Sequence, residues 1–202
     1  MASGTVVSSI PRRRLKAGDY HVEVARSLDA LMKVQAVRTL VYMGDQACPF
    51  EEEFDGNDFC GATHLLLSWR GEPVGCVRMR WFGEFAKFER LALRKEHRGG
   101  PGLLILCNAA FDLAARKGYR KLMGHAQVRG EAFWKRYFGG RPRPGRPRFH
   151  FSQFAYVEIE FDLKPHPKAV GLASPAMVLL RPEGAWDEPG VLEAHAAEEL
   201  AA

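Results

Sequence analysis

The feature that most constrains the fold is a strand-like segment that leads through a glycine-rich turn directly into an apolar helix. Residues 86–94, AKFERLALR, alternate as a strand does. The turn HRGGPG follows at 97–102, and residues 102–117 carry leucine and alanine at helical spacing before Gly118. The alternation places Phe88, Arg90 and Ala92 on one face of the strand, and Glu89, Leu91 and Leu93 on the other.

Further elements on both sides of this block predict a mixed α/β protein. Ser27 is positioned to cap a helix over 28–43, and Gly71-Glu72 has the form of a two-residue hairpin turn. The acidic segment 48–59 has no regular period and is expected to be a loop. Strands are expected at 20–26, 63–70, 73–82, 119–127 and 154–163, a short helix at 130–138, and a further strand at 177–181.

Length and composition indicate one globular domain with extensions. The 202 residues are 47% hydrophobic and 26% charged, as in ordinary folded proteins. Residues 1–18 are expected to form a flexible basic arm, 19–163 the domain, and 164–202 a C-terminal extension. No run of about 18 apolar residues is present, so we expect a cytoplasmic protein with no membrane partner.

The glycine turn itself has two interpretations. A helix begins with unpaired amides and a positive dipole end, so a glycine turn in front of it can hold a phosphate. Such turns are also often purely structural. The sequence is neither a Walker loop nor a dinucleotide fingerprint, because Gly-Lys-Ser/Thr and the third fingerprint glycine are both missing.

The order of elements around ERLALRKEHRGGPGLLIL resembles the GNAT superfamily of acyl-CoA-dependent acyltransferases. That resemblance implies a GNAT fold, with a central mixed, mostly antiparallel sheet flanked by helices, and a cofactor loop of the form Gln/Arg-x-x-Gly-x-Gly/Ala. The register with His97, Gly100 and Gly102 is preferred over the one that begins at Arg98. The implied cofactor contacts are Leu91, Ala92 and Leu93 through the strand backbone, and His97, Arg98, Gly99, Gly100, Gly102 and Leu103 in the loop.

Two other blocks extend the resemblance. AQVRGEAFWKRYFGG, 126–140, resembles the second cofactor segment of the superfamily, with Phe133-Trp134 at its Phe-Tyr pair. The tyrosine of that pair often protonates the departing thiolate, so Tyr137 is the candidate replacement. VRTLVYMGDQACPFEEEFDGNDFCGATHLLL, 37–67, resembles a branch related to the acyl-homoserine-lactone synthases, although a longer segment of those synthases is missing.

Within that third block, Arg38, Asp55 and Asp58 are the candidate substrate-binding residues. The two carboxylates are expected either to hold a cationic amine or to order the loop by an ion pair with Arg38. His64 is expected to be structural, and no ligand spacing predicts a metal site.

Glu89 is the candidate general base, because desolvation on a strand would raise its pKa toward a useful range. The alternative is an ion pair with Arg78, Arg80 or Arg90. No cysteine or serine lies in a nucleophile motif. We therefore expect direct transfer of an acetyl or longer acyl group from acyl-CoA to an amine-bearing small molecule or peptide, by a possible homodimer.

Two rival functions remain open. RPRPGRPR, 141–148, followed by Phe149 and Phe151, could form a nucleic-acid-binding surface, although no established nucleic-acid motif accompanies it. Because Trp134 stands where a tyrosine is usual, a catalytically inactive acyl-CoA-binding protein is the other alternative.

Overall fold

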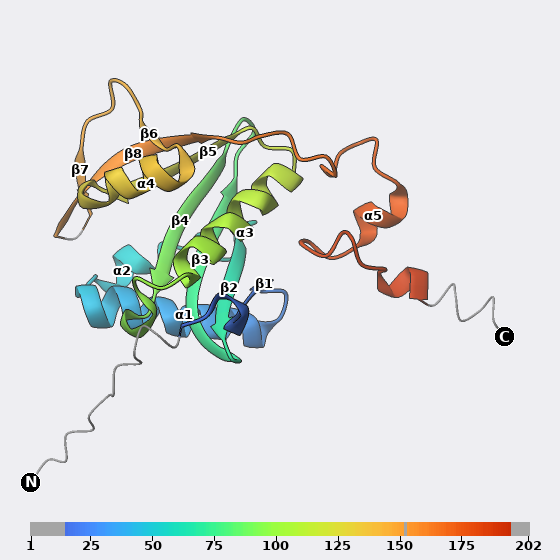
Figure 1. Ribbon diagram of the computed structural model, residues 1–202, viewed down its shortest axis with the longest axis horizontal. Helices are drawn as coiled ribbons and strands as arrows, with labels where there is room; N and C mark the ends of the chain where they lie inside the picture. Colours follow the sequence, from blue (N-terminus) through green and yellow to red (C-terminus); the bar gives the residue numbers. More distant parts are fainter. Residues whose placement is uncertain (1–14, 152, 195–202) are drawn as a thin grey trace, which may run out of the picture.

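The computed structural model describes residues 15–151 and 153–194, and the described chain is built on an eight-stranded sheet (Figure 1). The strands are β1 (Tyr20–Val24), β2 (Thr63–Trp69), β3 (Glu72–Trp81), β4 (Ala86–Leu93), β5 (Lys121–Gln127), β6 (Arg141–Pro142), β7 (Phe149–Phe151) and β8 (Phe154–Asp162). They follow the order β1-β2-β3-β4-β5-β8-β6, and β7 pairs with β8. Only β4 and β5 are parallel, which confirms the mixed, mostly antiparallel sheet.

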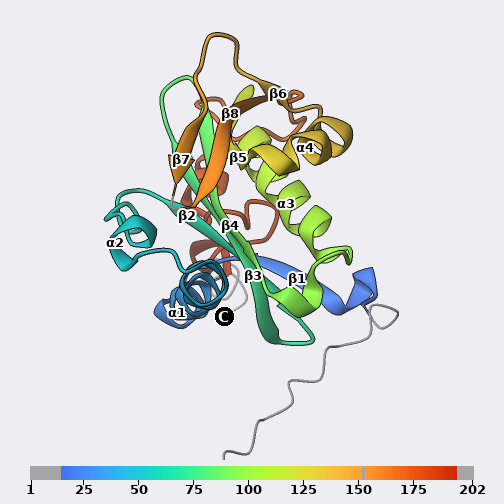
Figure 2. The same ribbon diagram turned by 90° about the vertical axis from the view of Figure 1, so that its left-hand side faces the viewer.

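Helices cover both faces of this sheet (Figure 2). On one face lie α1 (Leu28–Arg38), which continues as a π-helical segment over Thr39–Asp45, and the short α2 (Phe50–Glu53). On the other face lie α3 (Gly102–Arg116) and α4 (Glu131–Phe138). Each face therefore has its own apolar cluster, and the larger one is beneath α3.

Several local expectations are confirmed and others corrected. The Ser27 hydroxyl accepts a hydrogen bond from the Ala30 amide at 3.1 Å, as a helix cap does. The hairpin turn is Arg70-Gly71 rather than Gly71-Glu72, because both residues have positive φ angles and Trp69 pairs with Glu72. The segment expected as a strand at 177–181 forms the helix α5 (Ala176–Leu180) instead.

A β-bulge in β4 changes which side chains share a face. Cys76 pairs with Ala92 and Arg78 with Glu89, so that two residues, Arg90 and Leu91, stand opposite one residue of β3. Arg90 has a φ of 53°. The predicted alternation is therefore wrong after Glu89, and Phe88, Leu91 and Leu93 all pack with the cluster beneath α3.

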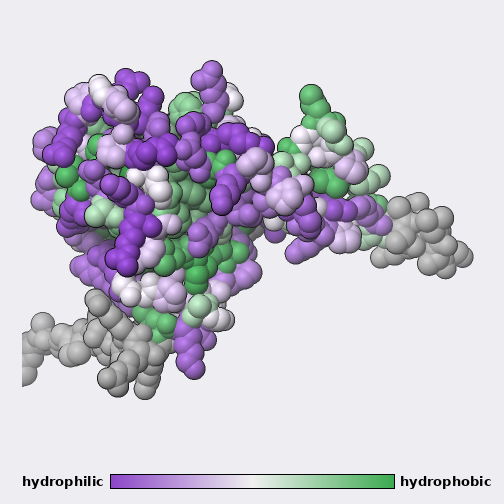
Figure 3. Space-filling model, turned by 45° about the horizontal axis from the view of Figure 1, so that its top comes forward, coloured by the Kyte–Doolittle hydropathy of each residue, from purple (hydrophilic) through white to green (hydrophobic). Residues whose placement is uncertain are grey.

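Both ends of the described chain pack against the domain. Leu15 is buried, so the last residues of the expected 1–18 arm belong to the fold, while residues 1–14 lie outside the described chain. In the extension, Glu183 pairs with Lys117 and Asp187 pairs with Arg116. Figure 3 shows hydrophobic residues on the surface of this extension, where Leu172 and Leu180 are exposed. Among the described helices, none has the length and apolar character needed to cross a membrane.

Candidate active site

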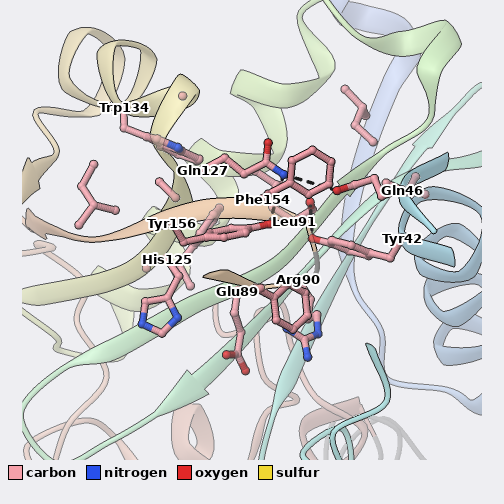
Figure 4. A pocket seen from close by; sticks show the side chains of 18 of the residues that line it. Tyr42, Gln46, Glu89, Arg90, Leu91, His125, Gln127, Trp134, Phe154 and Tyr156 are labelled. Carbon is pink, nitrogen blue, oxygen red and sulfur yellow. Dashed lines mark hydrogen bonds between the residues drawn. The ribbon is translucent and has the colours of Figure 1, made fainter. Parts of the chain in front are cut away.

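A cavity of about 920 Å³ lies where β4 and β5 separate. The two strands pair only from Ala86–Leu122 to Phe88–Gly124, and beyond Phe88 they diverge as a fork. Figure 4 shows side chains of β4, β5 and β8 around this space. Where strands part, their backbone groups lose the partner strand. Here the Leu91 and Leu93 carbonyls accept hydrogen bonds from the side chains of Tyr42 and Arg98 instead.

The glycine turn and the first turn of α3 form one wall of this cavity. Arg98, Gly99 and Leu103 line it. The first helical hydrogen bond runs from the Ile105 amide to the Pro101 carbonyl at 3.1 Å, so the amides of residues 102–104 precede the regular bonding pattern. Among the described residues no side chain caps the helix, and its first turn has no acidic residue. This end of α3 is therefore free to hold an anion.

The structure does not place His97 at the cavity. The side chain of His97 is buried and its Nδ1 lies 2.9 Å from the Tyr20 hydroxyl, facing the core rather than the cavity. Burial lowers the pKa of His97, so the ring is neutral near pH 7. A Cβ at Gly102 would lie 2.9 Å from the Tyr20 ring, so only glycine fits at this position without displacing that ring. Arg98, and not His97, is the loop cation at the cavity.

The Arg98 side chain is held in place by the protein itself. Its Nε donates to the Leu93 carbonyl at 2.9 Å, and Nη2 lies 2.7 Å from Asp45. Asp45 also lines the cavity and pairs with Lys95. A second arginine that follows β5, Arg129, also lines the cavity.

The expected cofactor residues of β4 divide between the two faces of the sheet. Leu91 and Leu93 line the cavity. Ala92 is buried in the other cluster, beneath α1, so that its side chain does not reach the cavity. The Tyr42 hydroxyl donates to the Leu91 carbonyl at 2.8 Å, which fixes the strand next to its bulge. Neither sequence pattern nor resemblance had indicated Tyr42.

Helix α4 contributes its aromatic pair but not its tyrosine. Phe133 and Trp134 line the cavity, and Trp134 lies edge-on to Phe88 with ring centroids 5.6 Å apart. Tyr137 is 53% exposed and does not line the cavity. The helix turns the Tyr137 side chain to solvent, so the structure does not place it among the residues that line the cavity.

The predicted substrate-binding residues form a buried ion network instead. Arg38 is fully buried, and it donates to Glu53 and to Asp58 at 2.5 Å each. Burial raises the pKa of Asp58, but hydrogen bonds from Arg38 and Arg78 outweigh it and lower the pKa below the ordinary value. Arg38 and Asp58 cannot contact a substrate here, which supports the alternative that they order the acidic loop.

Asp55 and His64 lie at the two edges of that network. Asp55 lines the cavity, but its carboxylate is held by Arg78 at 2.7 Å and by Arg90 at 3.1 Å. His64 is buried, with Nε2 3.2 Å from the Asp58 carbonyl, as expected for a structural histidine. Asp55 is therefore the single member of the predicted trio at the cavity surface.

Glu89 lines the cavity directly beyond the last paired residues of the fork. Its carboxylate lies 2.7 Å from Arg78 and 2.8 Å from Lys87. Burial raises the pKa of Glu89, but the hydrogen bond from Lys87 and the charge of Arg78 outweigh it, and the pKa lies below the ordinary value. The expected rise in pKa is wrong, and the alternative of an ion pair with Arg78 is confirmed.

Sequence reasoning missed the wall that β5, β7 and β8 provide. Figure 4 shows His125, Gln127, Phe154 and Tyr156 directed at the cavity. Gln127 Nε2 donates to the Tyr156 hydroxyl at 3.2 Å. The period-two alternation of β8 would have placed Phe154 and Tyr156 on one face, but no motif identified that face as functional.

Three of the four arginines of the Arg/Pro loop form ion pairs with β8. Arg141 pairs with Asp162, and Arg143 and Arg146 pair with Glu158. Phe149 and Phe151, which the nucleic-acid interpretation needs at the surface, line the cavity instead. These contacts do not favour a nucleic-acid-binding surface.

Comparisons with known proteins agree with this geometry. No family model matches the sequence. Over 114 residues the chain is 28% identical to the uncharacterized N-acetyltransferase YjcF of Bacillus subtilis, an alignment that spans 56% of this chain and 81% of that protein. An acyl-CoA N-acyltransferase structure from Pseudomonas aeruginosa superposes with a TM-score of 0.63 at 21% identity, over 71% of this chain and 98% of that one.

Two further structures share the fold. A GNAT family acetyltransferase from Elizabethkingia anophelis with acetyl-CoA bound has a TM-score of 0.52 at 12% identity, over 72% of this chain and 99% of that one. FeeM, an N-acyl amino acid synthase from uncultured soil microbes, has a TM-score of 0.58 at 10% identity, over 71% of this chain and 90% of that one. The chain has the GNAT fold, and its sequence is similar to that of an uncharacterized N-acetyltransferase.

Proposed function

We propose that this protein transfers an acyl group from acyl-CoA directly to an amine. The observation that carries the proposal is one cavity that contains both the open amides at the start of α3 and the fork between β4 and β5. Phosphate groups fit the first feature by charge and hydrogen bonding. An amide-bearing pantetheine arm fits the second, because it can pair with a strand edge as another strand would.

The donor would then run from Gly99 and Leu103 along the backbone of Leu91 to the fork. Arg98 and Arg129 supply positive charge at the phosphate end. Beyond the fork the wall is apolar and aromatic, and this part of the cavity would hold the acyl group. The apolar lining residues there are Phe88, Phe133, Trp134, Ile159 and Phe161. An acetyl group fits such a wall, and a longer acyl chain would cover more of it.

Direct transfer agrees with the chemistry of the cavity wall. None of the described lining residues is a cysteine or a serine. Burial raises the pKa of Cys76 to about 12, which keeps that thiol protonated and inert. We propose that the amine attacks the thioester without a covalent enzyme intermediate, and that the acceptor approaches from the side of Glu89.

The departing thiolate needs a proton donor, and we propose Tyr156 for this role in place of Tyr137. Its hydroxyl lies in the cavity wall and accepts a hydrogen bond from Gln127, which leaves its own proton to donate. Glu89 remains near the reacting groups, but its ion pairs suit an anion that orders charge around the acceptor better than a proton acceptor.

Acyl-CoA is expected to raise the melting temperature, because a ligand that binds only the folded state stabilises it, by about 2.7 kcal/mol at 100 times its Kd. Differential scanning fluorimetry with acetyl-CoA and octanoyl-CoA measures this shift and ranks the chain lengths. Acetylpantetheine, which lacks the phosphates, is the control and should give a much smaller shift. Native mass spectrometry of the purified protein should also detect bound acyl-CoA.

The proposal fails if neither acyl-CoA shifts the melting temperature and none is carried through purification. Binding of oligonucleotides with a steep salt dependence would instead favour the rival nucleic-acid function.

A further inference from the structure

His125 occupies the position in the fork that corresponds to Glu89. Phe88 and Gly124 are the last paired residues of β4 and β5, so the next residue on each strand is Glu89 and His125. Figure 4 shows the imidazole and the carboxylate on the same side of the two strands. Both residues line the cavity. A reacting group held in the fork would therefore have both side chains in the cavity wall beside it.

The imidazole of His125 is open to the cavity. Across the described residues, no hydrogen bond to either of its ring nitrogens is found. The His125 and Phe149 rings pack edge to face, with their centroids 4.9 Å apart. Lys87, Glu89 and Arg90 face it from β4, and Glu158 lies opposite it on β8. The ring is oriented by packing, while its nitrogens stay available.

We propose that His125 accepts the proton of the acceptor amine during acyl transfer. This assignment rests on the proposed function. The amine nitrogen forms a bond to the thioester carbon, its proton passes to the imidazole, and the carbon–sulfur bond breaks to release the CoA thiolate. The thiolate takes a proton from Tyr156, and both side chains then return to their starting states by proton exchange with solvent.

The neighbouring charges suit His125 to accept a proton and Glu89 to remain an anion. His125 is an exposed residue, but partial desolvation by the cavity wall and then the charge of Lys87 lower its pKa, while Glu158 and Glu89 oppose this. The ring is therefore neutral at pH 7 and can accept a proton. The carboxylate of Glu89 is already engaged by Arg78 and Lys87. Glu89 is therefore a positioning residue, which stabilises the imidazolium that forms beside it.

His125→Gln is expected to lower kcat by about 100-fold or more, within the range for loss of a general base. The Kd for acetyl-CoA should stay within a few-fold of the wild-type value. The control is His150→Gln on β7, an exposed histidine outside the cavity lining, which should leave kcat unchanged. Turnover is measured as CoA release, with the best acceptor among spermidine, benzylamine and phenylalanine.

The pH profile separates a chemical role from a structural one. The wild type should lose kcat/KM as the pH falls through the pKa of His125, determined independently by NMR of the imidazole. That acid limb should vanish in His125→Gln. In Glu89→Gln it should move to lower pH, because removing a neighbouring anion lowers the pKa of the imidazole.

Each outcome decides a different question. If His125→Gln turns over like the wild type with the same acid limb, the His125 assignment is overturned and the proposed function stands. If the wild type binds acyl-CoA neither in fluorimetry nor in mass spectrometry, the proposed function itself fails and the assignment with it.

Discussion

A single negative charge at residue 99 is expected to abolish acyl-CoA binding while the fold survives. Gly99 lies in the cavity wall, next to the open amides of α3, and is exposed. In Gly99→Asp a carboxylate would stand at the place proposed for the phosphates, where its charge repels them. The shift in melting temperature caused by acetyl-CoA should disappear, and isothermal titration calorimetry should show at least a 100-fold weaker Kd.

Gly99→Asn is the matched control for that variant. Gly99 has a φ of 78°, a conformation that both asparagine and aspartate tolerate better than other side chains. The two variants therefore carry similar backbone strain and similar bulk, and differ mainly in charge. If Gly99→Asn loses as much affinity as Gly99→Asp, bulk rather than charge explains the loss, and the proposed phosphate site is contradicted.

Replacing Arg38 by methionine is expected to lower the free energy of unfolding by about 3–5 kcal/mol. The guanidinium is fully buried between Glu53 and Asp58. Methionine keeps much of the alkyl volume but leaves both carboxylates in the interior with one cationic partner fewer. Urea unfolding at unchanged slope measures the difference, because the slope reports the surface exposed rather than the stability.

Lys33→Ala on the same helix is the control. Lys33 pairs with Asp29 at 2.6 Å, but both side chains are exposed, so this ion pair should add nothing measurable. A loss below about 1 kcal/mol in Arg38→Met would mean that the network is not a buried ion network in solution.

The same variant should shift the pH dependence of stability toward low pH. In the wild type, the lowered pKa of Asp58 gives stability that is present above pH 3.8 and lost as the pH falls through the folded value, whereas burial raises the pKa of Glu53, which has the opposite effect. In Arg38→Met, the buried anions bind protons more readily in the folded state than in the unfolded state. The variant should therefore be less stable at pH 8 than at pH 5, which unfolding curves at the two pH values would show.

Much of the fold was predictable because apolar periodicity is a local signal. The strands at 63–70 and 73–82 and the helix from Gly102 are confirmed nearly to the residue. The bulge at Arg90 was not predictable, because AKFERLALR alternates without a break and only its pairing with β3 shows the extra residue. The helix α5 was not predicted, because a short apolar run fits the period of a helix and the period of a strand equally well.

The site was predictable where backbone geometry defines it and not where side-chain direction does. The glycine turn and the Phe133-Trp134 pair do line one cavity. His97 and Tyr137 fit the expected spacing, but packing on Tyr20 and the turn of α4 direct them elsewhere. No sequence pattern indicated His125, because its place across from Glu89 follows only from the parallel pairing of β4 with β5.

Three residue pairs, from Ala86–Leu122 to Phe88–Gly124, are the whole of the described backbone pairing between the N-terminal and C-terminal halves of the sheet. Strands β1–β4 and strands β5–β8 are therefore joined through the backbone at one short segment. A donor that paired with the strands in the fork would extend this connection and make the sheet more rigid. Release of the CoA product after transfer would remove this added connection. The rigidity of the sheet would therefore change with each catalytic cycle.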